Sequence, residues 1–272
     1  MQRFRLQTGA FAAVLAFAAA LAFAAAQGIG QVASAATEPH LAIRHDTWKS
    51  STGACTRDFQ HASVTGVPAD VEARIDGLLA HMLASQLPDS RRSPSEREGA
   101  CAKAIAENAP YVKDVGHAYE EFEDADWTPG LAHGRWLSAR LHVTAFAGGA
   151  HPSDNYVSIT FDLDHGGYPV PRSGLYPSAQ RARLNSVLFT YEVALLKVLD
   201  PQDPLDAQAI GYLRQNVLAL NVDDSQILLT SAGIEVTGMQ DSEAARNEVV
   251  KVPYSALHGI GTPGGPLDPS TR

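Results

Sequence analysis

Residues 138–163, Ser138-Ala-Arg-Leu-His-Val-Thr-Ala-Phe-Ala-Gly-Gly-Ala-His-Pro-Ser-Asp-Asn-Tyr-Val-Ser-Ile-Thr-Phe-Asp-Leu163, decide the fold. Apolar and polar side chains alternate over 138–147 and again over 156–163, which is the period of a half-buried β-strand. Gly148-Gly149-Ala150-His151-Pro152 separates the two runs and has the composition of a turn. The stretch therefore predicts a β-hairpin or two adjacent antiparallel strands.

The rest of the chain surrounds this pair with helices and strands that are segregated in sequence. Apolar residues recur at three- and four-residue spacing after Pro68 and again over 178–199, which predicts two amphipathic helices. Short strand patterns follow at 217–230, 234–237 and 249–252. We therefore expect an α+β fold, with an antiparallel sheet packed against two or three helices. We divide the mature chain into an N-terminal strand and helix subdomain (37–110), an α+β domain (111–258) and a disordered Gly- and Pro-rich tail (259–272).

Residues 1–36 have the pattern of a secretory signal peptide. Two arginines precede an apolar run of 17 residues, Ala10 to Ala26, and small residues around Ala35 and Ala36 suit cleavage. The alternative is an uncleaved membrane anchor, but the run is short and Ala-rich for a stable span, which needs about 20 residues. We expect cleavage at Ala35 or Ala36, a periplasmic or secreted protein, and no integral membrane segment after cleavage.

Charge and cysteine content agree with this compartment. Two of the 21 Lys and Arg residues lie in the signal, which leaves 19 against 30 Asp and Glu and a net charge of −11 on the mature chain. Such a surface repels nucleic acid and favours cationic partners, although it also serves simply to keep a secreted protein in solution. Cys55 and Cys101 are the only cysteines, and in an oxidising compartment we expect them to form a disulfide.

Two motifs resemble a known family. Phe146-Ala-Gly-Gly-Ala-His-Pro152, followed by the strand that ends Thr160-Phe-Asp-Leu163, and the later Val250-Lys-Val-Pro-Tyr-Ser-Ala-Leu257 are similar to the extracytoplasmic domain of RsiV-type anti-sigma factors. The same domain accompanies PdaC-type peptidoglycan deacetylases. The resemblance covers roughly residues 40–258, but the stretch between Ile234 and Val249 departs from the family pattern. Only about nine residues precede the apolar run, so the cytoplasmic sigma-binding segment is not expected here.

The resemblance implies a role at the cell envelope. Proteins of this kind are implicated in sensing lysozyme or lie beside a domain that modifies peptidoglycan. A cationic lysozyme-like protein or a cell-wall glycan is therefore the expected partner, and the negative charge is compatible with the former.

Catalytic alternatives rest on the histidines and acids of the hairpin region. Three His and several Asp could bind a divalent metal: His142, His151, His165, Asp154, Asp162 and Asp164. Thr160-Phe-Asp-Leu-Asp also resembles the metal motif of polysaccharide deacetylases, but Leu163 interrupts its acidic pair and the chain has no His-x-x-x-His pair. No Gly-x-Ser-x-Gly elbow is present for a serine nucleophile.

We therefore predict a non-catalytic binding domain that uses no metal and no cofactor. The expected binding residues surround the hairpin turn: Gly148, Gly149, His151, Asp154 and Tyr156. The alternative is a metal-dependent enzyme that modifies peptidoglycan or another polysaccharide with the same His and Asp residues.

Overall fold

The computed structural model describes residues 38–115, 119–147, 152–199, 208, 210–211, 226–237 and 249–271. The expected signal peptide and the turn 148–151 lie outside the described residues. Residues 38–272 form one compact unit built on two sheets, and the α+β class predicted from the sequence is confirmed. None of the helices in the described ranges has the length and apolarity needed to cross a membrane.

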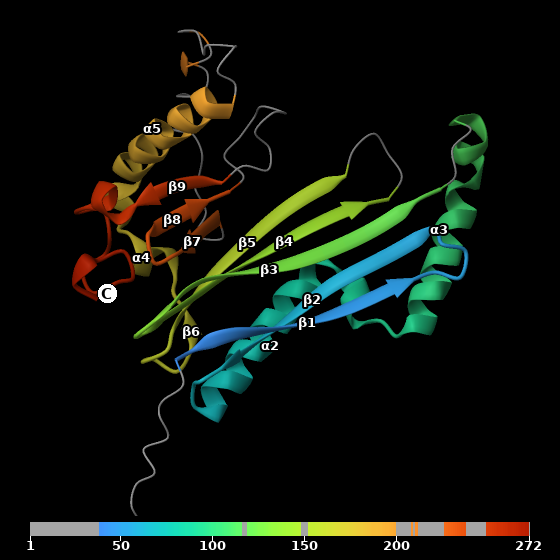
Figure 1. Ribbon diagram of the computed structural model, residues 1–272, viewed down its shortest axis with the longest axis horizontal. Coiled ribbons are helices and arrows are strands. Elements are labelled where there is room, and N and C mark those ends of the chain that lie inside the picture. Colours follow the sequence, from blue (N-terminus) through green and yellow to red (C-terminus); the bar gives the residue numbers. More distant parts are fainter. Residues whose placement is uncertain are drawn as a thin grey trace, which may run out of the picture. The chain divides into compact units, whose positions relative to one another are not determined.

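The larger sheet has six strands in the order of the chain (Figure 1). They are β1 (His40–Lys49), β2 (Cys55–Thr65), β3 (Glu121–His133), β4 (Trp136–Phe146), β5 (Ser153–Asp162) and β6 (Tyr168–Pro169). All neighbours are antiparallel except β2 and β3, which run parallel. Parallel neighbours need a long crossover, and the helices between β2 and β3 supply it.

Helix α2 (Ala69–Gln86) covers one face of this sheet. Its apolar residues recur with helical spacing, and Ile75, Leu79 and Leu83 are buried against β2, β4 and β5. Phe59, Leu141 and Phe161 are among the strand residues of the same core. A short 3₁₀ turn (Pro88–Arg91) then leads to α3 (Pro94–Val115), which is longer than the helix expected from Ala100 to Ala109.

The smaller sheet consists of β7 (Ile227–Leu229), β8 (Gly233–Val236) and β9 (Val250–Pro253), all antiparallel. It packs with α4 (Arg172–Leu175) and α5 (Arg181–Leu199) around a second core that includes Leu184, Leu188 and Val252. The predicted helix at 178–199 and the strands at 234–237 and 249–252 correspond to α5, β8 and β9.

Two of our expectations about chain organisation are wrong. The boundary at residue 110 falls inside α3, and the strands on both sides of it belong to one sheet. The tail is not disordered, because Ile260 and Leu267 are buried in the second core and residues 269–271 form a 3₁₀ turn. These two apolar side chains anchor a segment that Gly and Pro otherwise dominate.

Candidate functional site

The strands of the larger sheet present a polar face opposite α2. In β4 the odd-numbered residues Leu141 and Val143 are buried against the helix side, whereas His142 and Thr144 between them are only half-buried. Directly opposed residues of neighbouring strands point to the same side of a sheet. The register therefore places Asp58, Asp124, Thr144 and Asp154 in one row across β2–β5, and Asp126, His142 and Tyr156 in the next.

Asp154 and Tyr156, two of the predicted binding residues, lie in these rows and contact His142. The Tyr156 ring stacks on the His142 imidazole with 4.2 Å between centroids, and Asp154 Oδ1 lies 3.0 Å from His142 Nε2. Thr144 Oγ1 also donates to Asp154 Oδ1 over 2.7 Å. The other predicted residues, Gly148, Gly149 and His151, lie outside the described part of the chain.

Three further carboxylates belong to this polar face. Asp58 is opposite Asp124 in the sheet, and its side chain is 55 % exposed. Asp126 is exposed and accepts a hydrogen bond from Gln60 over 2.7 Å. Burial, reinforced by the negative charges of Asp58 and Asp126, raises the pKa of Asp124 above its ordinary value. We call Asp58, Asp124, Asp126 and Asp154 the acidic face.

The smaller sheet covers one end of the same side. Leu229 in β7 donates its backbone N–H to Ser138 Oγ over 3.2 Å, and Arg140 pairs with Glu235 of β8 at 3.2 Å. A side chain on Gly130 would collide with the Leu229 carbonyl, which shows how closely β7 approaches β3. Both faces of the first half of β4 are consequently buried, and the acidic face begins where this cover ends.

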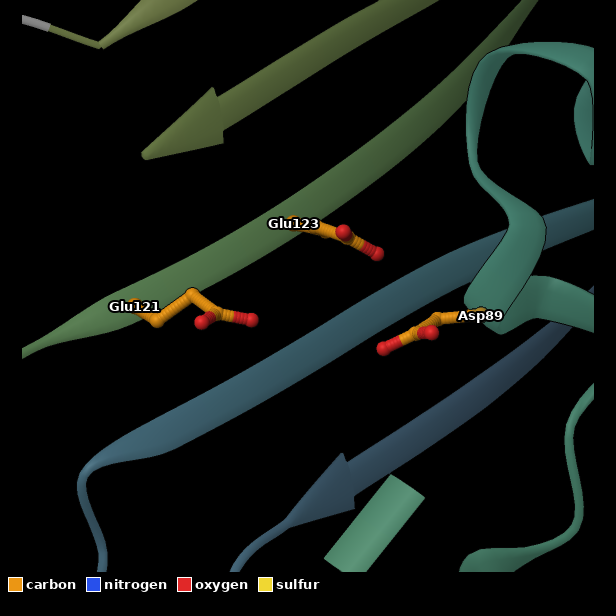
Figure 2. A group of neighbouring side chains, drawn as sticks. All are labelled: Asp89, Glu121 and Glu123. Atoms are coloured by element: carbon orange, nitrogen blue, oxygen red, sulfur yellow. The ribbon is translucent and has the colours of Figure 1, made fainter. Parts of the chain in front are cut away.

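On the helix side, a buried arginine holds together three acids from β3 and the turn after α2. Arg57, whose side chain is 1 % exposed, pairs with Asp89 at 2.9 Å, with Glu123 at 3.2 Å and with Glu121. Figure 2 shows Glu121 and Glu123 on β3 and Asp89 in the turn after α2, with their carboxylates gathered together. Tyr119 donates its hydroxyl to Glu121 over 2.7 Å. Burial, reinforced by the neighbouring Asp89 and Glu121 and opposed by Arg57, raises the pKa of Glu123 to about 7.

The same three acids bring carboxylate oxygens within 4.8 Å of one another, which is the spacing of a cation site. The guanidinium of Arg57 contacts all three and neutralises part of their charge. A metal ion would have to coexist with this buried positive charge, which is unfavourable. We therefore interpret the group as an internal ion-pair network that fixes β2, β3 and the turn after α2.

The histidines and acids of the hairpin that the structure describes do not form a single metal site; His151 lies outside the described residues. His142 contacts Asp154, whereas His165 lies 2.8 Å from Asp162, which faces Trp136 at the other end of β5. The two aspartates are eight positions apart along β5, or roughly 26 Å. Asp162 also accepts a hydrogen bond from Arg135 over 2.6 Å. Asp162 and Asp154 therefore belong to two separate groups of interacting side chains.

Comparison with known proteins finds solved structures with a similar fold. No family model and no curated protein matches the sequence. A crystal structure of a DUF3298 family member from Bacteroides fragilis NCTC 9343 is similar, with a TM-score of 0.57 and 14 % identity over 83 % of this chain and 93 % of that one. A DUF3298 family protein from Pseudomonas aeruginosa PAO1 gives a TM-score of 0.50 and 12 % identity over 83 % of this chain and 94 % of that one.

The chain shares the fold of these DUF3298 proteins. At such low identity the likeness concerns the fold alone. The RsiV-type resemblance stays a prediction, because neither comparison with sequences supports it.

Sequence reasoning missed most of the acidic face. Asp58 is 66 residues from Asp124 in the chain, and only the parallel pairing of β2 with β3 places them opposite each other. The disulfide between Cys55 and Cys101, by contrast, was predicted and is confirmed, with Cα atoms 6.1 Å apart. It anchors α3 to the start of β2.

Proposed function

We propose that this chain is a secreted or periplasmic binding domain without catalytic activity, which captures a cationic lysozyme-like protein at the cell envelope. The supporting observation is the acidic face, where four carboxylates from β2, β3 and β5 share one side of the sheet. Arg140 lies on the same side but is already paired with Glu235. A disulfide is also the form expected of a cysteine pair in an exported protein.

Electrostatics would give this surface its selectivity. The carboxylates repel one another in the free protein, and this repulsion adds to burial in raising the pKa of Asp124. A basic partner would relieve that repulsion and speed association, with an effect that salt screens. The paired strands of the sheet would hold these side chains on a preformed surface, which reduces the entropy lost on binding.

The test is binding of the full chain to a cationic lysozyme, measured by titration calorimetry at low and at physiological salt. We expect a complex that weakens as salt rises. The double variant Asp124→Asn/Asp126→Asn should bind at least about tenfold more weakly, because it removes two charges from the centre of the face.

A matched variant controls for overall charge. Asp70→Asn/Glu107→Gln also removes two negative charges, from exposed positions on α2 and α3 away from this face. It should bind as the wild type does. Equal affinities for both double variants, or no complex with the wild type, would contradict the proposal.

The alternative function is a metal-dependent enzyme that modifies peptidoglycan or another polysaccharide. It is favoured by the contact between His142 and Asp154, a ligand pair that zinc commonly uses. It predicts metal in the purified protein, product release from peptidoglycan, and loss of both in His142→Ala. A metal-free preparation that leaves peptidoglycan unchanged would favour the binding function.

A further inference from the structure

A separate cavity of about 300 Å³ lies at the opposite end of β4 and β5 from Asp154. It is an open pocket lined by the β3–β4 turn, the β5–β6 turn, α4 and the C-terminal segment. These elements lie together at one end of the large sheet (Figure 1). Its volume is at the lower end of the range for small-molecule sites. It is lined by Trp136, Tyr168 and the Thr262–Gly265 segment. A group of polar side chains forms another part of its wall.

The polar group consists of Arg135, Asp162 and His165. Arg135 donates to both oxygens of Asp162 in a two-pronged pair, with 2.6 Å for the Nε bond. His165 Nδ1 lies 2.8 Å from Asp162 Oδ2, and the turn N–H of His165 lies 3.3 Å from Oδ1. These bonds outweigh the effect of burial and lower the pKa of Asp162, which keeps the carboxylate ionised.

Two aromatic side chains complete the cavity. Tyr168 is 58 % exposed, and the guanidinium of Arg74 stands 4.5 Å from the centre of its ring. Trp136 is 2 % exposed and lies under the guanidinium of Arg135 at 4.5 Å. The indole Nε1 of Trp136 is buried and finds no hydrogen-bond acceptor among the described residues. Trp136 also belongs to the second hydrophobic core, so it contributes an apolar part of the cavity wall.

We propose that this cavity binds one unit of a neutral saccharide. The charges of Arg135 and Asp162 cancel, and Arg74, which stacks on Tyr168, is not among the residues that line the cavity. The lining residues therefore offer fixed polar atoms without excess charge, which suits hydroxyl groups. The exposed ring of Tyr168 supplies an apolar platform for the C–H face of a sugar. The inference goes beyond the acidic face and does not depend on it, because the two sites lie at opposite ends of β5.

The test is titration of the full chain with two neutral trisaccharides, tri-N-acetylchitotriose and maltotriose, at up to millimolar concentration. Calorimetry reports affinity, and the fluorescence of Trp136, one of three tryptophans, reports occupancy of the cavity. We expect one of the two sugars to bind and to change the fluorescence.

Variants of Tyr168 decide whether the binding is at this site. Tyr168→Ala should weaken binding roughly tenfold, whereas Tyr168→Phe keeps the ring and should bind as the wild type does. Exposure of Tyr168 makes both variants compatible with folding, which circular dichroism verifies. His81→Ala, an exposed position on α2, serves as the control and should have no effect.

Either of two results would overturn the proposal. One is that neither sugar binds to the wild type. The other is that Tyr168→Ala binds as tightly as Tyr168→Phe. A lysozyme complex that persists when no sugar binds would leave the acidic face supported and remove this cavity alone, so the two proposals fail separately.

Discussion

At the scale of single residues, the ionisation of Glu123 depends strongly on its surroundings. It shares the buried guanidinium of Arg57 with Asp89 and Glu121, so three acids compete for one positive charge. Arg92 adds a second cation beside Asp89, but its side chain is 45 % exposed. The ion-pair network is therefore short of positive charge, and burial together with the neighbouring acids raises the pKa of Glu123.

This pKa predicts that stability falls as the pH rises. The pKa of Glu123 is about 7 in the folded chain against an ordinary value of 4.5, so folding favours the protonated form. Stability from this group is fully present below pH 4.5 and is lost through pH 7, by at most about 3 kcal/mol. Glu123→Gln should remove this loss, measured by urea unfolding at pH 5 and pH 8.

The control for Glu123 is Glu107, an exposed glutamate in α3. Glu107→Gln should keep the wild-type difference between pH 5 and pH 8. An unchanged pH dependence in Glu123→Gln would show that the buried network tolerates a fully ionised Glu123.

At the scale of elements, α3 is attached to the large sheet by a few specific contacts. Cys101 forms the disulfide with Cys55, and Arg97 donates to Asp46 of β1 over 2.7 Å. The apolar cluster around the disulfide is small and includes Tyr119 and, half-buried, Trp48 and Ile105. The disulfide therefore supplies stability that α3 does not gain from burying apolar surface.

Removing the disulfide should accordingly loosen α3 before the rest of the sheet. The double variant Cys55→Ala/Cys101→Ala should lose roughly 3–4 kcal/mol, because the bond closes a long loop in the unfolded chain. Amide hydrogen exchange should accelerate in α3 more than in α2, which packs on the main core. The wild type under reducing conditions should behave in the same way, and uniform acceleration in both helices would contradict this account.

The periodicity of the sequence predicted the individual helices and strands better than it predicted which strands pair in the sheet. The patterns over 138–147, 156–163 and 178–199 correspond to β4, β5 and α5, because each buries one face and leaves the other polar. Nothing local indicated that β2 runs parallel to β3, since this pairing depends on the path of α2 and α3 between them. That pairing places Asp58 opposite Asp124 on the acidic face. It also brings Arg57 to Glu121 in the ion-pair network.

At the scale of the whole molecule, the C-terminal segment shows how composition misled the sequence analysis. Gly and Pro dominate after Gly259, which is typical of disorder, yet two of these glycines are needed for close packing. A side chain on Gly261 would come within 2.7 Å of Leu267, and one on Gly265 would meet the Gly174 carbonyl at 2.2 Å. Thr262 adds a backbone hydrogen bond to Leu175 at 3.0 Å, which ties the segment to α4.

The segment should therefore contribute to global stability as a core element does. Leu267 is 1 % exposed in the second core, and Leu267→Ala should cost roughly 2–5 kcal/mol in urea unfolding, because the cavity it leaves is enclosed. Ser270→Ala, an exposed position three residues further on, should change stability by less than about 0.5 kcal/mol. Because Thr262, Gly264 and Gly265 also line the proposed saccharide cavity, Leu267→Ala should weaken trisaccharide binding as well. If unfolding of Leu267→Ala matched that of Ser270→Ala, the last residues would be a loosely attached tail and would not form a wall of that cavity.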